Sequence, residues 1–416
     1  MELTAGYQKT EVGVIPDDWD VVSLAHLVEP TASICYGVVQ VGQHTPGGVP
    51  IVAIKFVKEI DSSPLHRTPA DHEKLFARSR VQGGDVLISV KGTIGRVGIV
   101  PEAFCGNISR ELARLRIRGD ISAEYIAHQL EEGTTQERIL RAVVGTTRLE
   151  FSIATVRQFE LPIPRTKNEQ CLIAATLSDV DALLGVLDRM ITKKRDLKQA
   201  AIQQLLTGKT RLPGFKAEWD DTTLGDIGEC VIGLTYKPEN VVEHGLLVLR
   251  SSNVQNSRLA YDNNVFVNLD VNEHLYTRPG DILVCVRNGS RALIGKCALI
   301  DEDSAGTTFG AFMSIYRTPY WRFIFHAFRA GHIQKQIRDN IGATINQITN
   351  KDMRALCVKL PPESEQAAIA EVLSDMDAEI AALEQRRDKT RDLKRGMMQE
   401  LLTGKTRLIA PEPSDA

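Results

Sequence analysis

The chain contains one long segment twice, and this duplication limits the folds open to it more than any other feature. Residues 169–212 align with residues 365–408 without a gap, and 24 of the 44 aligned positions are identical. Both copies begin with Glu-Gln and end with LLTGKTRL. A repeat of this length predicts that the same structural unit is built twice within one chain.

The end of each copy contains the Gly-Lys-Thr that closes a phosphate-binding loop. That loop also needs a glycine five residues before the Gly-Lys pair and a strand leading into it. Gln203 and Gln399 occupy the glycine position, and a helix-like stretch precedes the motif in both copies. The motif is better interpreted as the end of a helix, with Gly208 and Gly404 free to take a positive φ.

Apolar residues recur in both copies at alternating spacings of three and four, which is the pattern of a coiled-coil seam. The seam residues are Leu177, Val180, Leu184, Leu187 and Leu205 in the first copy and Leu373, Met376, Ile380, Leu383 and Leu401 in the second. The middle of the frame is polar, with Lys194 and Lys198 in one copy and Arg387, Thr390 and Lys394 in the other. Each helix of about 38 residues would be nearly 60 Å long, at about 1.5 Å per residue.

Charge indicates how the two helices pair. The first half of each helix is acidic and the second half is basic. An antiparallel pair places acid opposite base, whereas a parallel pair places like charges together. We therefore predict an antiparallel coiled coil within one chain. The alternative is two separate helices that face solvent.

The regions before the two helices also repeat, more weakly. Trp19-Asp20 corresponds to Trp219-Asp220, and GDVLI at 84–88 corresponds to GDILV at 280–284. Strand-like runs such as VPIVAIKFV, DVLISV, LLVLR and DILVCV predict mainly-β domains, with helices near 123–130 and 320–337. The predicted fold class is α+β, with two mainly-β domains separated by two long antiparallel helices and related by a pseudo-twofold. The predicted boundaries are 1–164 (first domain), 165–208 (first helix), 209–362 (second domain) and 363–416 (second helix and tail).

The composition is that of an ordinary globular chain of 416 residues, with 43% hydrophobic residues and a formal net charge of −3. No apolar run approaches the roughly 20 residues of a membrane span, and the N-terminus has no hydrophobic signal core. We therefore expect a cytoplasmic protein without a membrane partner. Seven scattered cysteines without a C-x-x-C pair predict reduced, mostly buried thiols and no metal site.

This arrangement resembles the specificity subunit of type I restriction-modification systems over essentially the whole chain. The resemblance rests most specifically on the two helix starts, EQCLIAATLSDVD and EQAAIAEVLSDMD, and on the two LLTGKTRL ends. It implies two target-recognition domains, each reading one half of a split double-stranded DNA sequence, and helices that dock two methyltransferase subunits. It also implies that S-adenosylmethionine, ATP and Mg²⁺ act in the methyltransferase and restriction (motor-nuclease) subunits, and that this chain binds no cofactor.

The physical requirements of such a task agree with the resemblance. Two half-sites on one face of a duplex lie about one helical turn apart, about 34 Å, or somewhat more. Long paired helices are a suitable spacer over that distance. Because the two domains differ in sequence outside the framework positions, we expect two different half-sites and an asymmetric, gapped target.

Base readout requires side chains such as Arg, Lys, Asn and Gln, and loops that follow strands are the usual carriers. Polar loops at corresponding places in the two domains supply the candidates. In the first domain they are Tyr36, Lys55, Lys91, Thr93, Arg96, Thr147 and Arg148; in the second they are Tyr236, Lys237, Arg250, Ser251, Asn253, Arg287, Asn288, Arg291, Thr344 and Asn346. The alternative for each residue is a solvated turn position.

Enzymatic alternatives lack their motifs. A DNA methyltransferase would carry an Asn-Pro-Pro-Tyr or Asn-Pro-Pro-Phe loop and a Gly-rich loop, and a nuclease would gather carboxylates and a lysine around Mg²⁺. The sequence shows neither pattern, so we expect no catalysis in this chain. A protein-interaction scaffold without a sequence-specific DNA role remains as the other alternative. It would explain the coiled coil but not two related β domains with divergent polar loops.

Overall fold

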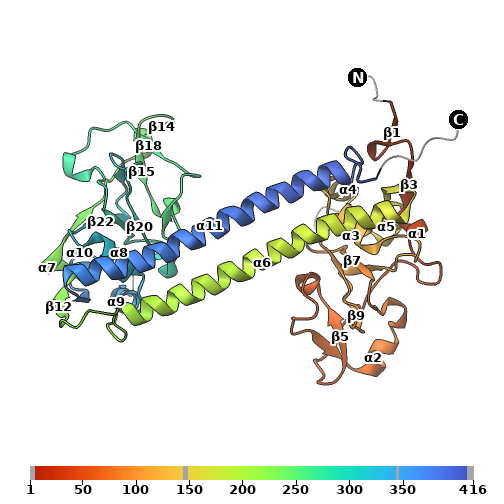
Figure 1. The fold of residues 1–416 in the computed structure, drawn as a ribbon, viewed down its shortest axis with the longest axis horizontal. Helices are drawn as coiled ribbons and strands as arrows, with labels where there is room; N and C mark the ends of the chain where they lie inside the picture. Colours follow the sequence, from red (N-terminus) through yellow and green to blue (C-terminus); the bar gives the residue numbers. More distant parts are fainter. Residues whose placement is uncertain (1–4, 144–148, 343–345, 410–416) are drawn as a thin grey trace. The chain divides into compact units, whose positions relative to one another are not determined.

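The computed structural model describes residues 5–143, 149–342 and 346–409. The chain divides into unit 1, formed by Met1–Asp188 and Gln385–Ala416, and unit 2, formed by Arg189–Glu384. Two helices of 39 residues, α6 (Lys167–Leu205) and α11 (Glu363–Leu401), belong partly to each unit. Each unit therefore consists of a globular domain and part of both long helices (Figure 1).

Unit 1 contains a four-stranded antiparallel sheet in the order β4-β10-β7-β8 and a three-stranded sheet in the order β6-β5-β9, in which β5 and β9 are parallel. Two further pairs are β3 with β11 and β1 with β2. The strands are β1 (Tyr7–Thr10), β2 (Gly13–Pro16), β3 (Trp19–Ser23), β4 (Cys35–Tyr36), β5 (Val49–Val52), β6 (His66–Thr68), β7 (Val86–Ser89), β8 (Val97–Ile99), β9 (Asn107–Ile108), β10 (Leu112–Leu115) and β11 (Glu160–Pro164). The helices are α1 (Leu24–Leu27), α2 (Ala70–Lys74), α3 (Ala123–Glu131), α4 (Gly133–Ala142) and α5 (Ile153–Gln158), with short 3-10 turns η1 (Ile54–Phe56) and η2 (Ala77–Ser79).

Unit 2 repeats this plan, with a four-stranded antiparallel sheet in the order β13-β22-β19-β20 and a second sheet in the order β14-β18-β15-β21. Strand β12 pairs with β23, and β16 pairs with β17. The strands are β12 (Asp220–Thr223), β13 (Glu229–Ile232), β14 (Val241–Val242), β15 (Leu246–Leu249), β16 (Val254–Gln255), β17 (Arg258–Leu259), β18 (Phe266–Val267), β19 (Ile282–Cys285), β20 (Cys297–Leu299), β21 (Thr308–Phe309), β22 (Met313–Arg317) and β23 (Cys357–Leu360). The helices are α7 (Leu224–Ile227), α8 (Trp321–Arg329), α9 (Gly331–Asn340) and α10 (Asn350–Arg354), with 3-10 turns η3 (Pro238–Asn240), η4 (Ser251–Asn253), η5 (Glu273–Leu275) and η6 (Arg291–Leu293).

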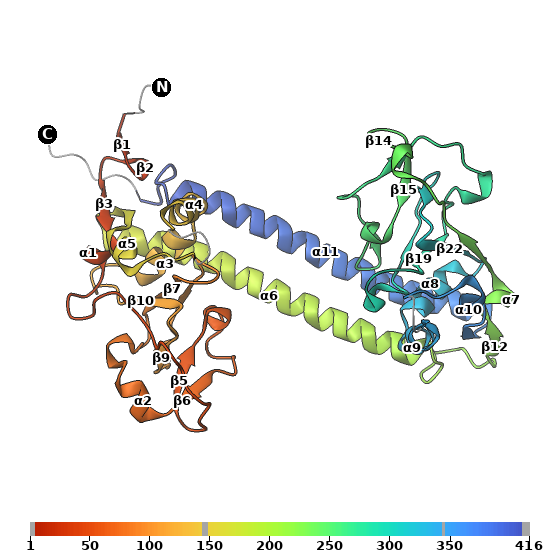
Figure 2. The ribbon, with the colours of Figure 1, turned by 180° about the vertical axis from the view of Figure 1, so that it is seen from behind.

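Each domain has a part next to the long helices and a part away from them. In unit 1, α3, α4 and α5 lie beside α6, while β5, β6 and β9 lie away from it (Figures 1 and 2). One apolar core joins the helix-side part to the long helices and contains Trp19, Leu177 and Leu401. A second core, which includes Val52 and Leu87, supports the outer sheet. Unit 2 has two corresponding cores.

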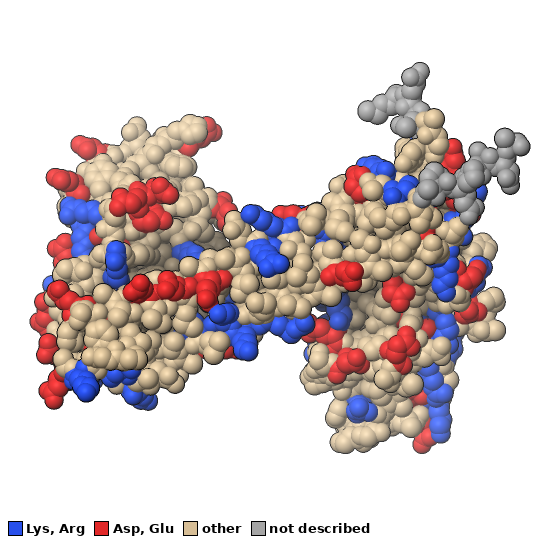
Figure 3. Space-filling model, in the orientation of Figure 1, with Lys and Arg blue, Asp and Glu red and all other residues tan. Residues whose placement is uncertain are grey.

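The long helices run antiparallel within each unit, as predicted. Acidic residues from the first half of one helix pair with basic residues from the second half of the other. The pairs are Asp181–Lys394 (2.6 Å) and Asp188–Arg387 (3.6 Å) in unit 1, and Glu384–Arg195 (2.6 Å) and Asp377–Lys198 in unit 2. Other acidic residues of α11 remain at the surface in unit 2, where this helix shows a row of acidic side chains (Figure 3).

The predicted seam positions lie between the helices and the domains. Leu177, Leu187, Leu205, Leu373, Ile380 and Leu401 are buried, and Val180, Leu184, Met376 and Leu383 are half-buried. In the polar middle of the frame, Lys198 is only 4% exposed, and Lys194, Arg387, Thr390 and Lys394 are half-buried. The seam is therefore apolar at its ends and ionic in its middle.

Both LLTGKTRL motifs end a helix, which confirms that interpretation. Gly208 and Gly404 take φ values of +69° and +71°. Their amides donate to the carbonyls of Leu205 and Leu401, so these N–H groups are used inside the turn. The repeated Gly-Lys-Thr is therefore a helix stop.

The arginine of each motif ties the end of one long helix to the start of the other. In unit 2, Arg211 donates to both carboxylate oxygens of the fully buried Glu365, at 2.5 and 2.6 Å, and lies over the ring of Trp219. In unit 1, Arg407 makes the equivalent contacts to Glu169 and Trp19. This explains why the helix start, the helix end and the tryptophan all recur in the sequence.

Two secondary-structure predictions were wrong in detail. The strand predicted across residues 49–57 ends at Val52, and residues 54–56 form a 3-10 turn. The single helix predicted near residues 320–337 is broken at Ala330, whose extended backbone (φ −74°, ψ 142°) separates α8 from α9. Tertiary packing decided the break in the helix, because Ala330 is fully buried in the unit 2 core.

The cysteines are all free thiols, as predicted. Cys35, Cys285 and Cys297 are buried, but Cys105, Cys171 and Cys357 are exposed, so the expectation that most are buried was wrong. Among the residues that the structure describes, no group of three or more His, Cys, Asp and Glu side chains is arranged to hold a metal ion.

Candidate nucleic-acid interface

Three polar loops meet on the unit 2 domain. Asn288, after β19, donates from Nδ2 to the hydroxyl of Ser251, after β15, at 3.0 Å. Asn346 donates from Nδ2 to the carbonyl of Gly289 at 2.9 Å, and its own carbonyl accepts from the Asn288 amide. Residues predicted from three separate stretches of sequence therefore form one surface.

A cavity adjoins this surface. It is lined by residues that include Tyr236, Arg250, Ser251 and Phe312, and its volume is about 610 Å³. The Arg250 guanidinium donates from Nη2 to the carbonyl of Asn263 at 3.0 Å. Its buried Nε has no hydrogen-bond partner in the described part of the chain. The cavity thus combines aromatic walls with an arginine whose hydrogen-bonding capacity is not exhausted.

Phe312 is a residue that the sequence reasoning missed. It is 54% exposed, and the Arg287 guanidinium carbon lies 4.8 Å from its ring centroid. The backbone amides of Val286 and Arg287 both donate to the Phe312 carbonyl, at 3.1 Å. An exposed aromatic ring beside an arginine is a suitable surface for a base or a sugar.

The other candidates in unit 2 have varied surroundings. Lys237 is exposed and pairs with Glu239 at 3.4 Å, and Arg291 donates to the carbonyl of Ile341 at 3.3 Å. Asn253 is fully buried, where its side chain accepts from the Arg250 amide and donates to the Ala260 carbonyl. The prediction that Asn253 contacts DNA directly is therefore wrong. Its buried side chain instead holds the backbone of Arg250 in place. Thr344 lies outside the described residues.

The first domain builds the corresponding surface from different residues. Lys91 lies over the ring of Tyr36, at 5.3 Å, and pairs with Glu150 at 3.2 Å. Lys91 forms an isolated antiparallel bridge with Glu150, and Arg287 forms the same bridge with Gln347 in unit 2. Lys91 and Arg287 therefore occupy equivalent positions, as the sequence comparison predicted.

The remaining candidates in unit 1 are mostly exposed. Lys55 is exposed and lies 4.5 Å from the ring centroid of Phe56. Thr93 and Arg96 have exposed side chains, and their backbone atoms bond to the hydroxyl of Ser89. Thr147 and Arg148 lie outside the described residues.

Glu111 is the counterpart of Phe312. The amides of Val90 and Lys91 donate to the Glu111 carbonyl, just as those of Val286 and Arg287 donate to the Phe312 carbonyl. The same backbone position therefore presents a carboxylate in one domain and an aromatic ring in the other. The sequence alignment did not show this equivalence, because the β9–β10 and β21–β22 segments share little sequence and are matched by hydrogen bonding to the neighbouring loop.

The long helix α6 carries a second line of apolar residues outside the seam. In unit 1, Leu183 and Val186 are 38% and 42% exposed on α6, and in unit 2, Met190 and Leu197 are 43% and 49% exposed on the same helix. An 18-residue window of α6 has a mean hydropathy of 1.5, so by length and composition alone the helix could cross a membrane. Of that window, 28% is buried inside the protein. These exposed apolar side chains make the outer face of α6 a candidate contact site.

Comparison with known proteins places these features in a family. The family model described as type I restriction modification DNA specificity domain matches residues 16–192 and again residues 216–390. A type I restriction enzyme specificity subunit of Methanocaldococcus jannaschii, MjaVIII, is 22% identical, covering 95% of this chain and 94% of that protein. The EcoBI specificity subunit of Escherichia coli is 22% identical over 56% of this chain and 50% of its own length.

The fold has a solved counterpart. The crystal structure of a type I restriction-modification system S subunit from M. genitalium superimposes with a TM-score of 0.62, covering 96% of this chain and 98% of that chain at 17% identity. At this level of identity the likeness concerns the fold alone.

Proposed function

The chain belongs to the family of type I restriction-modification specificity subunits, and from this premise we propose that it reads an asymmetric, two-part DNA target. The unit 1 domain reads one half of the target and the unit 2 domain reads the other. The chain itself carries out no chemistry.

One observation carries this proposal: the two domains place different side chains at equivalent positions of equivalent loops. In unit 2 the loops present Arg287 and Phe312, and in unit 1 they present Lys91 and Glu111. Arginine is suited to the acceptor edge of guanine, whereas a carboxylate accepts from the amino group of cytosine. Recognition of two unlike half-sites requires different base-contacting side chains at equivalent backbone positions.

The exposed line of α6 supports a second part of the proposal, which is that methyltransferase subunits dock on the long helices. Leu183 and Val186 are 38% and 42% exposed on a helix whose opposite side is already packed. An apolar stripe at helical spacing fits the face of a partner helix. S-adenosylmethionine, ATP and Mg²⁺ would then act in the methyltransferase and motor-nuclease partners.

The test of target recognition is a methylation map. A bacterial host free of DNA methylation receives this gene with its neighbouring methyltransferase gene, or the methyltransferase gene alone, and long-read sequencing records the modified bases. We expect an asymmetric motif of two short halves around a fixed gap, present only when this chain is made. If no motif forms although the two proteins co-purify, the scaffold alternative replaces the proposal.

Docking is tested separately, by co-purification of the methyltransferase with chains carrying Leu183→Glu and Val186→Glu. We expect the paired substitution to reduce the bound methyltransferase at least tenfold. Leu75→Glu is the matched control, because Leu75 is 77% exposed in the unit 1 domain and not on either long helix. Equal recovery of methyltransferase with both chains would rule out this helix face as the docking site.

A further inference from the structure

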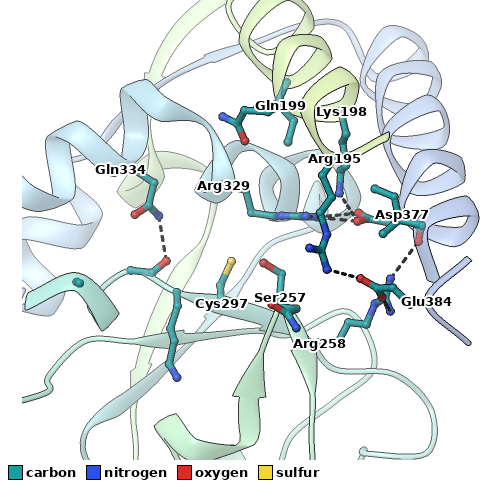
Figure 4. A pocket seen from close by; sticks show the side chains of 16 residues that line it. Arg195, Lys198, Gln199, Ser257, Arg258, Cys297, Arg329, Gln334, Asp377 and Glu384 are labelled. Atoms are coloured by element: carbon teal, nitrogen blue, oxygen red, sulfur yellow. Dashed lines mark hydrogen bonds and ion pairs between the residues drawn. The ribbon is translucent and has the colours of Figure 1, made fainter. Parts of the chain in front are cut away.

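A cavity in unit 2 collects more positive than negative charge. Its volume is about 390 Å³, and it lies between α6, α11, the β16–β17 turn and the segments around α8 and α9 (Figure 4). Its basic lining residues are Arg195, Lys198, Arg258, Lys296 and Arg329, whereas its acidic ones are Asp377 and Glu384. All of these residues belong to unit 2.

Each carboxylate of the cavity is shared between two cations. Asp377 pairs with Lys198 and with Arg329, whose Nη1 lies 2.7 Å from Oδ2. Glu384 pairs with Arg195 at 2.6 Å and with Arg258 at 3.3 Å. Figure 4 shows Lys198 and Arg329 converging on Asp377, with Arg195 reaching toward Glu384. The four cations paired with the two carboxylates therefore keep two positive charges without a full counter-charge, and Lys296, which donates to the carbonyl of Val254, adds a third.

The surplus charge is not all solvated. The side chain of Lys198 is 5% exposed and that of Arg329 is 18% exposed. Burial, together with the neighbouring Arg329, lowers the pKa of Lys198 to about 8. A buried charge without a full partner is unfavourable unless a counter-ion neutralises it.

Backbone geometry fixes Arg258 at the edge of this cavity. The turn between β16 and β17 consists of Asn256 and Ser257, which take φ values of +50° and +60°. This tight turn presents Arg258 to α11, where its Nη2 donates to the carbonyl of Asp377 at 3.0 Å. The cation is held by main-chain geometry and by two contacts with one helix.

The equivalent place in unit 1 has no surplus of positive charge, because Glu131 there also pairs with Lys58 at 2.6 Å. Lys394, the counterpart of Lys198, is shared between Asp181 at 2.6 Å and Glu131 at 4.0 Å. Glu131 ends α3 at the position where Arg329 ends α8. One domain therefore surrounds its seam lysine with carboxylates, while the other adds an arginine and opens a cavity beside it.

We propose that the unit 2 cavity is a binding site for a phosphate group. A dianion would neutralise the surplus of the four paired cations, and the cavity is large enough to admit it. Neutral donors, including Gln199 and Ser257, line the same space. The phosphate group comes either from free phosphate or from the backbone of DNA, and this site does not depend on base recognition.

The experiment uses the full chain in a buffer free of phosphate and sulfate. Isothermal titration calorimetry with inorganic phosphate is compared with an addition of chloride at equal ionic strength. We expect one phosphate per chain, at least tenfold weaker binding in Arg329→Gln and Lys198→Met, and unchanged binding in Lys394→Met. Circular dichroism confirms that each variant is folded.

Titration with a short duplex then separates the two sources. If the DNA backbone supplies the phosphate, Arg329→Gln weakens duplex binding without changing sequence preference. It also lowers the slope of the logarithm of duplex affinity against the logarithm of salt concentration by about one. Free phosphate then competes with the duplex for the site. If free phosphate is the ligand, the variant loses phosphate binding and keeps its duplex affinity. Absence of phosphate binding to the unaltered chain at millimolar concentration, with the same salt slope in both proteins, would overturn the proposal.

Discussion

Replacing Lys198 with methionine should stabilise the protein, although the substitution removes an ion pair. Lys198 is 4% exposed, and its pKa is about 8 instead of the usual 10.5. A difference of this size means that the folded state disfavours the charged form by about 3 kcal/mol, at about 1.36 kcal/mol per pH unit. Asp377 keeps Arg329 as its partner, so the substitution leaves no carboxylate unpaired. Methionine fills a similar volume without the charge.

The pH dependence of this gain follows from the direction of the pKa change. Below pH 8 the lysine is charged in both states, so the folded protein carries the whole penalty. Between pH 8 and 10.5 the folded state loses the proton first, and the penalty shrinks as the pH rises. The advantage of Lys198→Met should therefore be largest at neutral pH and close to zero near pH 10.5.

The assay is thermal unfolding followed by tryptophan fluorescence, because Trp219 and Trp321 belong to unit 2. For a unit of this size, about 3 kcal/mol corresponds to a rise of roughly 6–12 °C in the transition temperature. Lys394→Met is the control, since Lys394 is paired with two carboxylates and its replacement should lower stability in unit 1. A lower transition temperature for Lys198→Met, or a gain that does not change with pH, would refute the reasoning.

Three further predictions concern other sites. Burial lowers the pKa of His326 to about 3, so the unfolded state takes up a proton on this histidine first as the pH falls below 6.5. The free energy of unfolding of unit 2 should therefore fall by about 2 kcal/mol by pH 5. In urea unfolding, a chain with His326→Gln should show a stability that depends less on pH. Glu169→Gln should destabilise unit 1 by about 2 kcal/mol, because Arg407 then loses a charge-assisted partner, and the unfolding midpoint followed at Trp19 will show whether it does. If the proposed function holds, Arg287→Ala should relax the methylated motif at one position of one half-site, with a loss of about 1–3 kcal/mol in base discrimination. Arg322 is the control because it lies on α8, over the ring of Trp321 and outside the polar loops, so Arg322→Ala should leave the motif intact.

If the unit 2 cavity binds phosphate, the burial of Lys198 has a functional reason that offsets its cost in stability. Lys394 in unit 1 and Lys198 in unit 2 are equivalent lysines of the seam. In unit 2, Arg329 lies next to the lysine, whereas in unit 1 the carboxylate of Glu131 takes that place. A residue that opposes folding where its counterpart does not is expected at sites that bind a ligand. If the Lys198→Met chain is more stable and binds no phosphate, the two results together support this explanation.

The amino-acid sequence by itself determined the repeat, the two long helices and their antiparallel direction. Hydrophobic spacing and the division of charge along each helix are local properties, and the ion pairs Asp181–Lys394 and Glu384–Arg195 confirm what they predicted. The helix ends at Gly208 and Gly404 could likewise be predicted from the sequence, because glycine readily takes the positive φ that ends a helix.

Only the tertiary structure decided which side chains meet. Glu111 and Phe312 occupy equivalent positions because their carbonyls accept from equivalent loop amides, and no sequence spacing shows that. The burial of Asn253 beneath Arg250, and the gathering of four cations around Asp377 and Glu384, depend on residues far apart in the chain. Spacing along a helix or strand is fixed by local geometry, whereas the surplus of charge in a cavity depends on which distant elements pack around it.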